Sequence, residues 1–337
     1  MNPQATAAPA ARPVAADVLT FGETMLSLQT EGPVSTGALA RTTLAGAESN
    51  VAIGLARLGH RVSWAGRLGA DEPARLILRT LRGEGVDVRH ATTDPEAPTG
   101  SMLRERLVAD VARVHYWRTG SAASRQRPEH LTEALRAGAR ILHVTGITCA
   151  IGPGPRAAVT AAVEHAREHG WTVVLDVNHR ARLWSRDQAA QALRPLRDRI
   201  DVVIASADEL PLIAGDDATA AEDDAAAEDA RVAELLAAGV REVVVKRGGD
   251  GADLHGSDGR RLRRPAHPVP VVDTVGAGDA FCAGYLSGLL DGLAPAERLR
   301  RACTTGAFAV ATAGDWEGLP HRDELTVMDA PPGSAIR

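Results

Sequence analysis

Residues 273–281 read Asp-Thr-Val-Gly-Ala-Gly-Asp-Ala-Phe, and this stretch decides the fold that we predict for the chain. A run of β-type residues, 269–272, interrupted by Pro270, precedes it, and an apolar segment with helical character, 280–290, follows it. We therefore predict a strand that turns through small residues into a helix. The backbone N–H groups of residues 276–278 would gather at the N-terminus of that helix. Unpaired N–H groups and the positive end of the helix dipole favour a bound anion there.

Asp279 lies directly after this turn. A carboxylate beside an anion site is electrostatically costly unless it has a role, and one such role is to take a proton from an alcohol that attacks a phosphate. The alternative is a Gly-rich turn in which Asp279 is an ordinary acid in the first turn of a helix. Two other phosphate motifs are excluded. A Rossmann fingerprint needs a third small residue where Phe281 stands, and a P-loop needs a Gly-Lys-Ser/Thr tripeptide that the sequence lacks.

The nine-residue string resembles the C-terminal motif of the ribokinase-like (PfkB) sugar kinases. In that family the Gly-Ala-Gly backbone forms an anion hole for the transferring phosphoryl group, and the aspartate is the catalytic base. Residue by residue, the resemblance implies an anion hole made by Gly276, Ala277 and Gly278, with Asp279 as the catalytic base.

The composition is that of a globular protein with a sizeable core. The chain has 337 residues, 45% of them hydrophobic, which suits one large α/β domain or two ordinary ones. The net charge of −5 gives no support to nucleic-acid binding. Lys246 is the only lysine, and the other 37 of the 38 basic residues are arginines, so a single arginine is weak evidence for a site.

Three cysteines without a CxxC pair, Cys149, Cys282 and Cys303, suit reduced thiols in a cytosol. No apolar run is long enough to span a bilayer, so we expect a cytoplasmic protein without membrane contact. Residues 1–16 are rich in Ala and Pro and lack the apolar core of a signal peptide, which predicts a disordered tail. We expect the folded domain at 17–325 and a C-terminal tail at 326–337.

Short apolar runs alternate with helical patterns along most of the chain. The predicted strands are residues 18–21, 62–65, 141–144, 173–177, 202–205 and 243–246, and the predicted helices are 50–58, 73–82, 155–168 and 225–238. This alternation predicts an α/β fold with a mostly parallel sheet covered by helices on both faces. The resemblance implies the same ribokinase-like architecture.

Two stretches depart from the alternation of strands and helices. Residues 33–45 and 99–118 look extended, and 99–108 with 111–118 could pair as a hairpin around 109–110. We predict that they form a small β lid over one end of the sheet. Exposed strands commonly pair with a partner edge, so a homo-oligomer through the lid is one expectation.

Ligands of open α/β sheets bind beyond the carboxyl ends of the strands. The string Gly46-Ala-Glu-Ser-Asn50 precedes a predicted helix and could hydrogen-bond sugar hydroxyls, or Ser49 or Asn50 could simply cap the helix. It resembles the N-terminal motif of the same sugar kinases, in which the Gly and the Asn contact the sugar. The resemblance therefore implies that Gly46 and Asn50 bind substrate.

The resemblance extends to the nucleotide and its metal ion. Ser206-Ala-Asp-Glu209 occupies the place of the family's Asn-x-x-Glu motif, which helps to position Mg²⁺ and the phosphates; Glu209 matches it, as an indirect ligand, and Ser206 departs from it. A first-turn helix acid is the alternative for Glu209. The family often binds a monovalent cation near the places of Asp273 and Val275, and the sequence leaves that ion open.

Further nucleotide contacts are assigned to residues that follow predicted strands or belong to the anion hole. They are Asn178, Ser206, Lys246, Gly248, Gly249, Gly251, Gly276 and Gly278. The string at 246–251 resembles the family's Gly-containing nucleotide loop, although a plain hairpin turn would also account for it.

Strings at 116–124, 143–148, 176–180 with 183–184, and 314–320 resemble one branch of the family, the 2-keto-3-deoxygluconate kinases. In that branch an aromatic residue and an arginine of the lid, and an arginine after a central strand, hold the substrate, which implies Tyr116, Arg118 and Arg180 here. A guanidinium group matches the carboxylate of a sugar acid in a bidentate way.

The sequence therefore predicts an ATP- and Mg²⁺-dependent kinase that phosphorylates the primary hydroxyl of a sugar acid, 2-keto-3-deoxygluconate, to its 6-phosphate. The alternatives within the family are a fructokinase, a ribokinase or a kinase for another keto-deoxy sugar. Those outside it are a sugar-binding regulator without turnover and, more remotely, a nicotinamide oxidoreductase.

Overall fold

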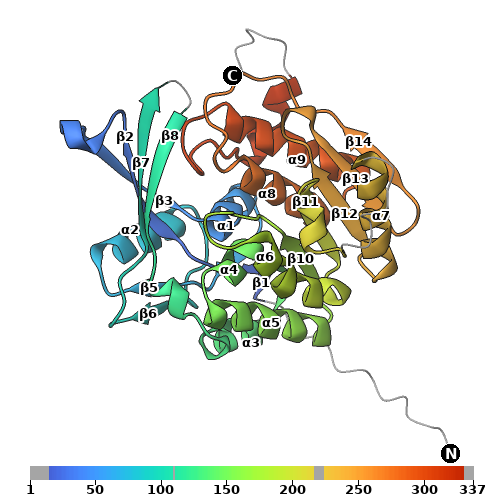
Figure 1. Ribbon diagram of the computed structural model, residues 1–337, viewed down its shortest axis with the longest axis horizontal. Coiled ribbons are helices and arrows are strands. Elements are labelled where there is room, and N and C mark those ends of the chain that lie inside the picture. Colours follow the sequence, from blue (N-terminus) through green and yellow to red (C-terminus); the bar gives the residue numbers. More distant parts are fainter. Residues whose placement is uncertain (1–14, 109–110, 216–223, 330–337) are drawn as a thin grey trace, which may run out of the picture.

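The computed structural model describes residues 15–108, 111–215 and 224–329. Its main feature in those residues is an eight-stranded sheet with the order β14-β13-β12-β11-β10-β9-β1-β4 (Figure 1). Neighbouring strands run parallel, except that β13 is antiparallel to β12 and β14. The strands are β1 (Ala16–Thr20), β4 (Val62–Trp64), β9 (Ala139–Thr145), β10 (Thr172–Asp176), β11 (Val202–Ser206), β12 (Glu242–Lys246), β13 (Ala252–Gly256) and β14 (Arg261–Arg264).

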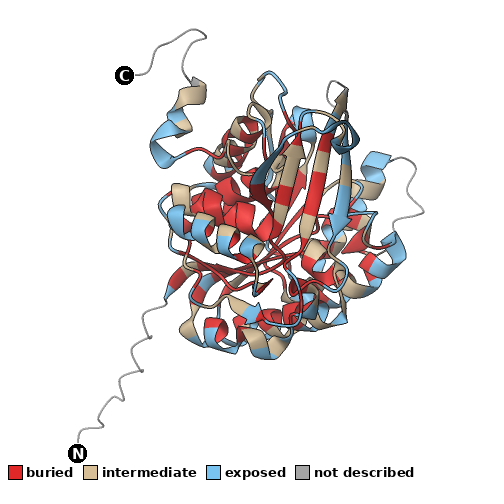
Figure 2. Ribbon diagram, turned by 90° about the vertical axis from the view of Figure 1, so that its left-hand side faces the viewer, coloured by how far each residue is buried: buried red, intermediate tan, exposed pale blue. Residues whose placement is uncertain are grey.

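Helices cover both faces of this sheet, as the sequence predicts. Successive strand residues point to opposite sides, so apolar strands place apolar side chains on both faces, and each face needs a cover. In β12, Val243 and Val245 pack into one core and Val244 packs into the other. Figure 2 shows the buried residues concentrated in the sheet and on the helix faces against it. One core is covered by α3 (Thr132–Ala137), α4 (Gly146–Ala150), α5 (Pro153–Glu168), α6 (Arg186–Leu193) and α7 (Asp224–Ala237). The other is covered by α1 (Ala47–Arg57), α2 (Glu72–Gly83), α8 (Ala277–Leu290) and α9 (Pro295–Val310).

A separate four-stranded sheet, with the order β3-β2-β7-β8, forms the lid beside the main sheet (Figure 1). The predicted hairpin is present as β7 (Ser101–Val108) and β8 (Val111–Trp117), and its tip, 109–110, lies outside the described residues. The sequence also predicts β3 (Ala40–Ala45) but misses β2 (Met25–Thr30), which pairs with both β3 and β7. A two-stranded sheet of β5 (Arg67–Gly69) and β6 (Thr92–Asp94) lies apart from the lid pairing.

The predicted strand at 269–272 is wrong. These residues form no strand, because Pro268 and Pro270 carry no N–H group to donate to a sheet. The N–H of Val272 instead donates to the carbonyl of Val310 at the end of α9, at 2.9 Å. The segment therefore packs along α9 before the chain enters α8, and only the turn-to-helix half of that prediction holds.

The ends of the domain differ slightly from the predicted bounds. β1 begins at Ala16, one residue before the predicted domain, and a 3-10 helix, Arg322–Asp329, occupies the start of the predicted C-terminal tail. Residues 1–14 of the predicted disordered tail, residues 330–337 of the predicted C-terminal tail, and residues 216–223 lie outside the described residues. Among the described helices, none has the length and apolarity needed to cross a membrane.

Candidate active site

The turn before α8 can be built only with glycine at position 276. Gly276 is the N-cap of α8 and has a φ of 75°, in the left-handed region. A Cβ atom on Gly276 would lie 2.0 Å from the carbonyl oxygen of Asp315, so the two backbones touch directly. The first N–H groups of α8 have no earlier helical carbonyl to bond, and they lie at the positive end of the helix dipole. The N–H of Ala277 makes a long turn hydrogen bond, 3.4 Å, to the carbonyl of Thr274.

Asp279 lies in the first turn of α8 and is buried, with only 7% of its surface exposed. Its carboxylate accepts a hydrogen bond from Nδ2 of Asn50 in α1 at 2.8 Å and one from Nδ2 of Asn178, which follows β10, at 3.4 Å. Asn178 has a positive φ of 38°, which is uncommon for a residue other than glycine. Three segments that are distant in sequence therefore converge on one carboxylate.

Burial, the largest effect, raises the pKa of Asp279 above its ordinary value. The hydrogen bond from Asn50 opposes this shift, whereas the negative charge of Asp176 adds to it. A carboxylate with a raised pKa accepts a proton more readily than an exposed aspartate does, which is what a general base for an alcohol requires.

A cleft of about 250 Å³, here called the lid cleft, opens in front of Asp279 between the lid and the main sheet. Seven of the predicted residues line it: Gly46, Asn50, Tyr116, Arg118, Arg180, Gly276 and Asp279. The predicted sugar-binding residues thus share one cavity with the predicted base.

Arg118 is engaged within this cleft. Its Nη2 atom lies 2.5 Å from Oε2 of Glu23, a buried carboxylate that also accepts the hydroxyl of Ser121, and its guanidinium group lies over the ring of Tyr116. Arg180, by contrast, is exposed, and it donates to the backbone carbonyl of His179 at 3.3 Å. The charge of Arg118 is therefore balanced by Glu23, and the charge of Arg180 is better placed to meet an incoming anion.

A second cleft, of about 420 Å³ and here called the loop cleft, lies on the other side of the α8 N-terminus. Its wall is mostly apolar, and six predicted residues line it: Lys246, Gly248, Gly249, Gly251, Ala277 and Gly278. Because Gly276 and Asp279 face the lid cleft and Ala277 and Gly278 face the loop cleft, the first turn of α8 separates the two cavities.

Lys246 forms an ion pair with the buried Asp176, with 2.7 Å between Nζ and Oδ1. Burial by itself would lower the pKa of Lys246, but the carboxylate of Asp176 raises it above its usual range. The ammonium group therefore stays protonated beside the loop cleft.

Three predicted nucleotide or metal residues, Asn178, Ser206 and Glu209, lie outside the linings of both clefts. Glu209 is buried, and its two carboxylate oxygens accept the backbone N–H groups of His179 and Ser206, at 2.7 and 2.9 Å. Glu209 therefore ties together the loops that follow β10 and β11, and with both oxygens so engaged it suits an indirect contact with a metal ion.

The lid cleft also contains Glu23, which follows the first predicted strand, and three charged residues that sequence reasoning missed: Arg104, Arg182 and Asp315. Asp315 stands inside a string that resembles the sugar-acid kinases, and Arg182 lies between the two parts of another such string; these locations were the available signal. Arg104 had no local signal, because the sequence is rich in arginine.

Burial, followed by the negative charge of Glu317, raises the pKa of Asp315 to about 7. Between the ordinary value of 3.8 and that value, the folded state holds a proton that the unfolded state releases, so stability from this group falls as the pH rises through about 7. We expect Asp315→Asn to raise the melting temperature relative to the parent by an amount that grows between pH 5 and pH 8. Asp258→Asn, at an exposed turn, should show no such growth, and a constant difference for Asp315→Asn would contradict the shifted pKa.

Comparison with known proteins shows which protein family has this fold and this site. A family model described as pfkB family carbohydrate kinase matches residues 15–322, so the chain belongs to the pfkB family of carbohydrate kinases. It is 34% identical to the 2-dehydro-3-deoxygluconokinase of Bacillus subtilis over 92% of this chain and 94% of that protein.

Solved structures show the same fold. A PfkB protein from Polaromonas sp. JS666 superposes with a TM-score of 0.80 and 36% identity, over 93% of this chain and 99% of that one. A protein described as a ribokinase II from E. coli, crystallised with ATP and Mg²⁺, superposes with a TM-score of 0.84 over the same shares of the two chains. Its identity of 23% supports the fold alone. The predicted family and α/β fold are therefore confirmed, and the protein is a carbohydrate kinase.

Proposed function

We propose that the protein transfers the γ-phosphoryl group of ATP to the primary hydroxyl of 2-keto-3-deoxygluconate and forms the 6-phosphate. The observation that carries this proposal is the position of Asp279, which is buried at the first turn of α8 between two clefts. The identity with the Bacillus subtilis enzyme supports the choice of sugar.

In this mechanism the sugar occupies the lid cleft, with Gly46 and Asn50 binding its hydroxyls, and the nucleotide occupies the loop cleft. Asp279 takes the proton of the attacking hydroxyl as its oxygen bonds to the γ-phosphorus, and ADP leaves with the electrons of the broken P–O bond. The N–H groups at Gly276, Ala277 and Gly278 hold the negative charge of the transferring group. Catalysis is then positioning and electrostatic stabilisation without a covalent intermediate.

Lys246 and the glycines Gly248, Gly249 and Gly251 would contact the nucleotide, and Asn178 and Ser206 would act from the ends of β10 and β11. Mg²⁺ would neutralise charge on the phosphates, with Glu209 reaching it through water. The proposal contains no monovalent cation at Asp273, because Arg104 already places a positive charge against that carboxylate at 2.5 Å.

The carboxylate of the sugar acid would be bound by Arg180, with Arg118 and Tyr116 completing the wall of the lid cleft. Arg180→Ala should raise KM for the sugar acid roughly 10- to 100-fold, because a hydrogen bond to a charged group contributes about 1.5–3 kcal/mol. The measurement is KM for the acid and for a neutral hexose phosphorylated by the same enzyme. Arg186→Ala, an exposed arginine outside the cleft lining, is the matched control. Equal losses for acid and neutral sugars would place carboxylate recognition elsewhere.

A panel of sugars with coupled detection of ADP tests the substrate itself. The panel should include fructose, ribose and the C4 epimer of the keto-deoxy acid, because these separate the alternatives within the family. Bound sugar without ADP formation would favour a regulator, and a strict preference for fructose or ribose would overturn the sugar-acid proposal.

We also propose that the enzyme acts in the cytoplasm, where its three free and buried cysteines stay reduced.

We further propose that two copies of the protein associate through their lids. Trp117 of the lid strand β8 is an exposed large side chain outside the lining of the lid cleft, which supports such a contact. Light scattering across a concentration series tests the association, and a monomer at all concentrations would refute it.

A further inference from the structure

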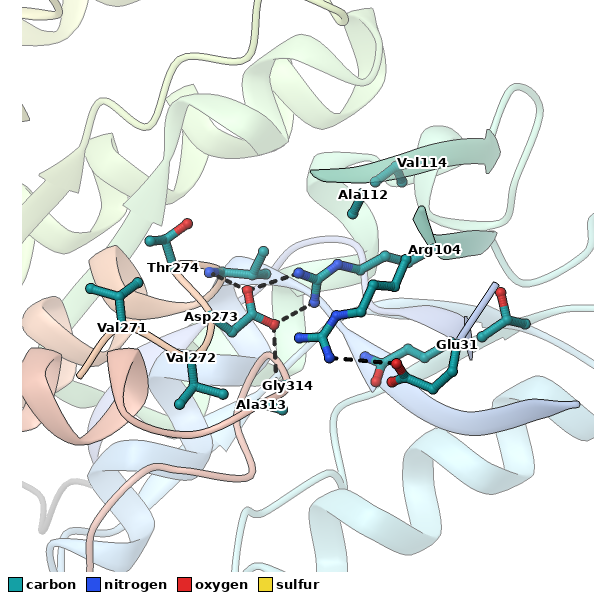
Figure 3. A pocket seen from close by; sticks show the side chains of 14 residues that line it. Glu31, Arg104, Ala112, Val114, Val271, Val272, Asp273, Thr274, Ala313 and Gly314 are labelled. Atoms are coloured by element: carbon teal, nitrogen blue, oxygen red, sulfur yellow. Dashed lines mark hydrogen bonds and ion pairs between the residues drawn. The ribbon is translucent and has the colours of Figure 1, made fainter. Parts of the chain in front are cut away.

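A lid residue reaches across to the turn that precedes α8. Arg104 of β7 and Asp273 form a bidentate ion pair, with Nη1–Oδ2 at 2.5 Å and Nη2–Oδ1 at 2.8 Å. Their side chains are 19% and 5% exposed, so the pair is largely removed from water. Figure 3 shows the guanidinium group of Arg104 and the carboxylate of Asp273 facing each other from opposite sides of a pocket.

The same carboxylate also holds the backbone on both sides of the Gly276 contact. Oδ1 of Asp273 accepts the N–H of Val275, the residue before Gly276, at 3.1 Å. Oδ2 accepts the N–H of Gly314, the residue before Asp315, at 3.3 Å. Since a Cβ on Gly276 would meet the carbonyl oxygen of Asp315, the carboxylate of Asp273 joins the two segments at the place where they touch.

We propose that Arg104 is a positioning residue for phosphoryl transfer: acting through Asp273, it couples the closed position of the lid to the shape of the anion hole. This inference rests on the proposed function of the site. With the lid closed, Arg104 balances the charge of Asp273, and the carboxylate fixes the turn at Val275 and Gly276. Movement of the lid away from the turn would leave a buried carboxylate without its cation, which is costly, and the turn would relax.

The coupling has a direct consequence for the reaction. The N–H groups at the start of α8 would be aligned on the transferring phosphoryl group only while the lid covers the sugar. When sugar is absent and the lid is open, these N–H groups would not be aligned, so water in the site would hydrolyse ATP only slowly.

The chain offers a matched control on the same strand. Arg106 lies two residues beyond Arg104, so its side chain points to the same face of β7, and both line the same pocket. Arg106 pairs instead with Glu31, which is 83% exposed, at 3.4 Å. Arg106→Gln therefore removes an equal charge from the same face of the lid without touching the turn.

The kinetic test compares Arg104→Gln, Asp273→Asn, the double variant and Arg106→Gln. We expect Arg104→Gln to lower kcat about 10- to 100-fold with KM for ATP within about twofold, because the turn is misplaced rather than the nucleotide cleft. The double variant should be no worse than the worse single variant, since both remove the same contact. Arg106→Gln should keep the parent kcat.

Arg104 also lines the lid cleft, so a direct contact with the sugar is the competing explanation. A rise in sugar KM with unchanged kcat, or additive losses in the double variant, would establish that contact and overturn the coupling. Equal losses of kcat in Arg104→Gln and Arg106→Gln would mean that the positive charge of the lid causes the effect, and would overturn the coupling through Asp273.

Hydrogen exchange gives a readout that does not need turnover. In the ligand-free protein, Arg104→Gln should speed amide exchange in peptides covering 273–281 and 312–316, and Arg106→Gln should not. Unchanged exchange in Arg104→Gln overturns the coupling even if the protein proves to act on another sugar. Faster exchange in an enzyme that does not phosphorylate the sugar acid would keep the coupling and refute only the substrate. If Asp273→Asn fails to fold, Arg104→Lys, which keeps the charge but loses the bidentate geometry, should give intermediate exchange and kcat.

Discussion

Replacement of Asp279 by Asn is expected to lower kcat by about 10²–10⁴, the range found when a general base is removed. The amide keeps the size of the carboxylate and can still contact Asn50, so the sugar and ATP should bind with nearly parental affinity. The loss should therefore appear in kcat and kcat/KM together, as expected for an interaction made in the transition state. Steady-state kinetics and calorimetric titration of each substrate provide the measurement.

The same substitution should not destabilise the fold. Because burial raises the pKa of Asp279, the folded protein loses stability as the pH rises through the folded-state pKa, where a buried group must carry a charge. The amide introduced by Asp279→Asn stays neutral at every pH, so we expect an equal or higher melting temperature for this variant at pH 8. Higher stability with lower activity is the signature of a residue retained for chemistry.

Asp187 offers the control for the plainer reading of Asp279 as a first-turn helix acid. It occupies the first turn of α6, is exposed and lies outside both clefts. Asp187→Asn should cost at most a few tenths of a kcal/mol in stability and leave kcat unchanged. If Asp279→Asn behaved in the same way, the assignment of the base would be wrong.

The local parts of this site follow from the sequence because they depend on neighbouring residues. Small residues followed by an apolar helical run predict the turn at Gly276 and the helix after it, and alternation of strands and helices predicts the two-sided sheet. The strand expected at 269–272 failed for a local reason as well, because Pro268 and Pro270 outweigh the three valines of this segment.

The contacts that shape the site electrostatically could not be predicted in this way. Arg104 and Asp273 are 169 residues apart, and Arg118 meets Glu23 across most of the N-terminal third of the chain. The chain has 37 arginines, and tertiary structure decides which of them meet distant partners such as these. β2 was missed for a related reason, since its pairing with β7 joins segments that only the folded lid brings together.

The first turn of α8 separates the two clefts, and it carries both the proposed base and the N–H groups of the proposed anion hole. Asp279 lines the lid cleft and Gly278 lines the loop cleft. If the sugar and the nucleotide occupy these clefts as we propose, the phosphoryl group must cross the N-terminus of α8. Any displacement of that turn moves the base and the anion hole together.

Gly276→Ala is expected to abolish most activity for that reason. Alanine at a φ of 75° costs roughly 1 kcal/mol or more by itself, and its Cβ would lie 2.0 Å from the carbonyl oxygen of Asp315, well inside van der Waals contact. One of the two backbones must therefore move by an ångström or more, and a displacement of about 1 Å can cost roughly 10²-fold in rate. We expect kcat to fall at least that far, with a lower melting temperature.

Gly292, just after α8, separates the cost of the backbone conformation from the cost of the Cβ clash. Its φ of 68° is nearly the same, but a Cβ there would meet no atom within 4 Å. Gly292→Ala therefore carries only the conformational cost, and should lower the melting temperature slightly while leaving kcat intact. The difference between the two variants measures the contact of Gly276 with Asp315. Equal kcat values for Gly276→Ala and Gly292→Ala would mean that the turn tolerates displacement, and the anion hole would then have to be built from other N–H groups.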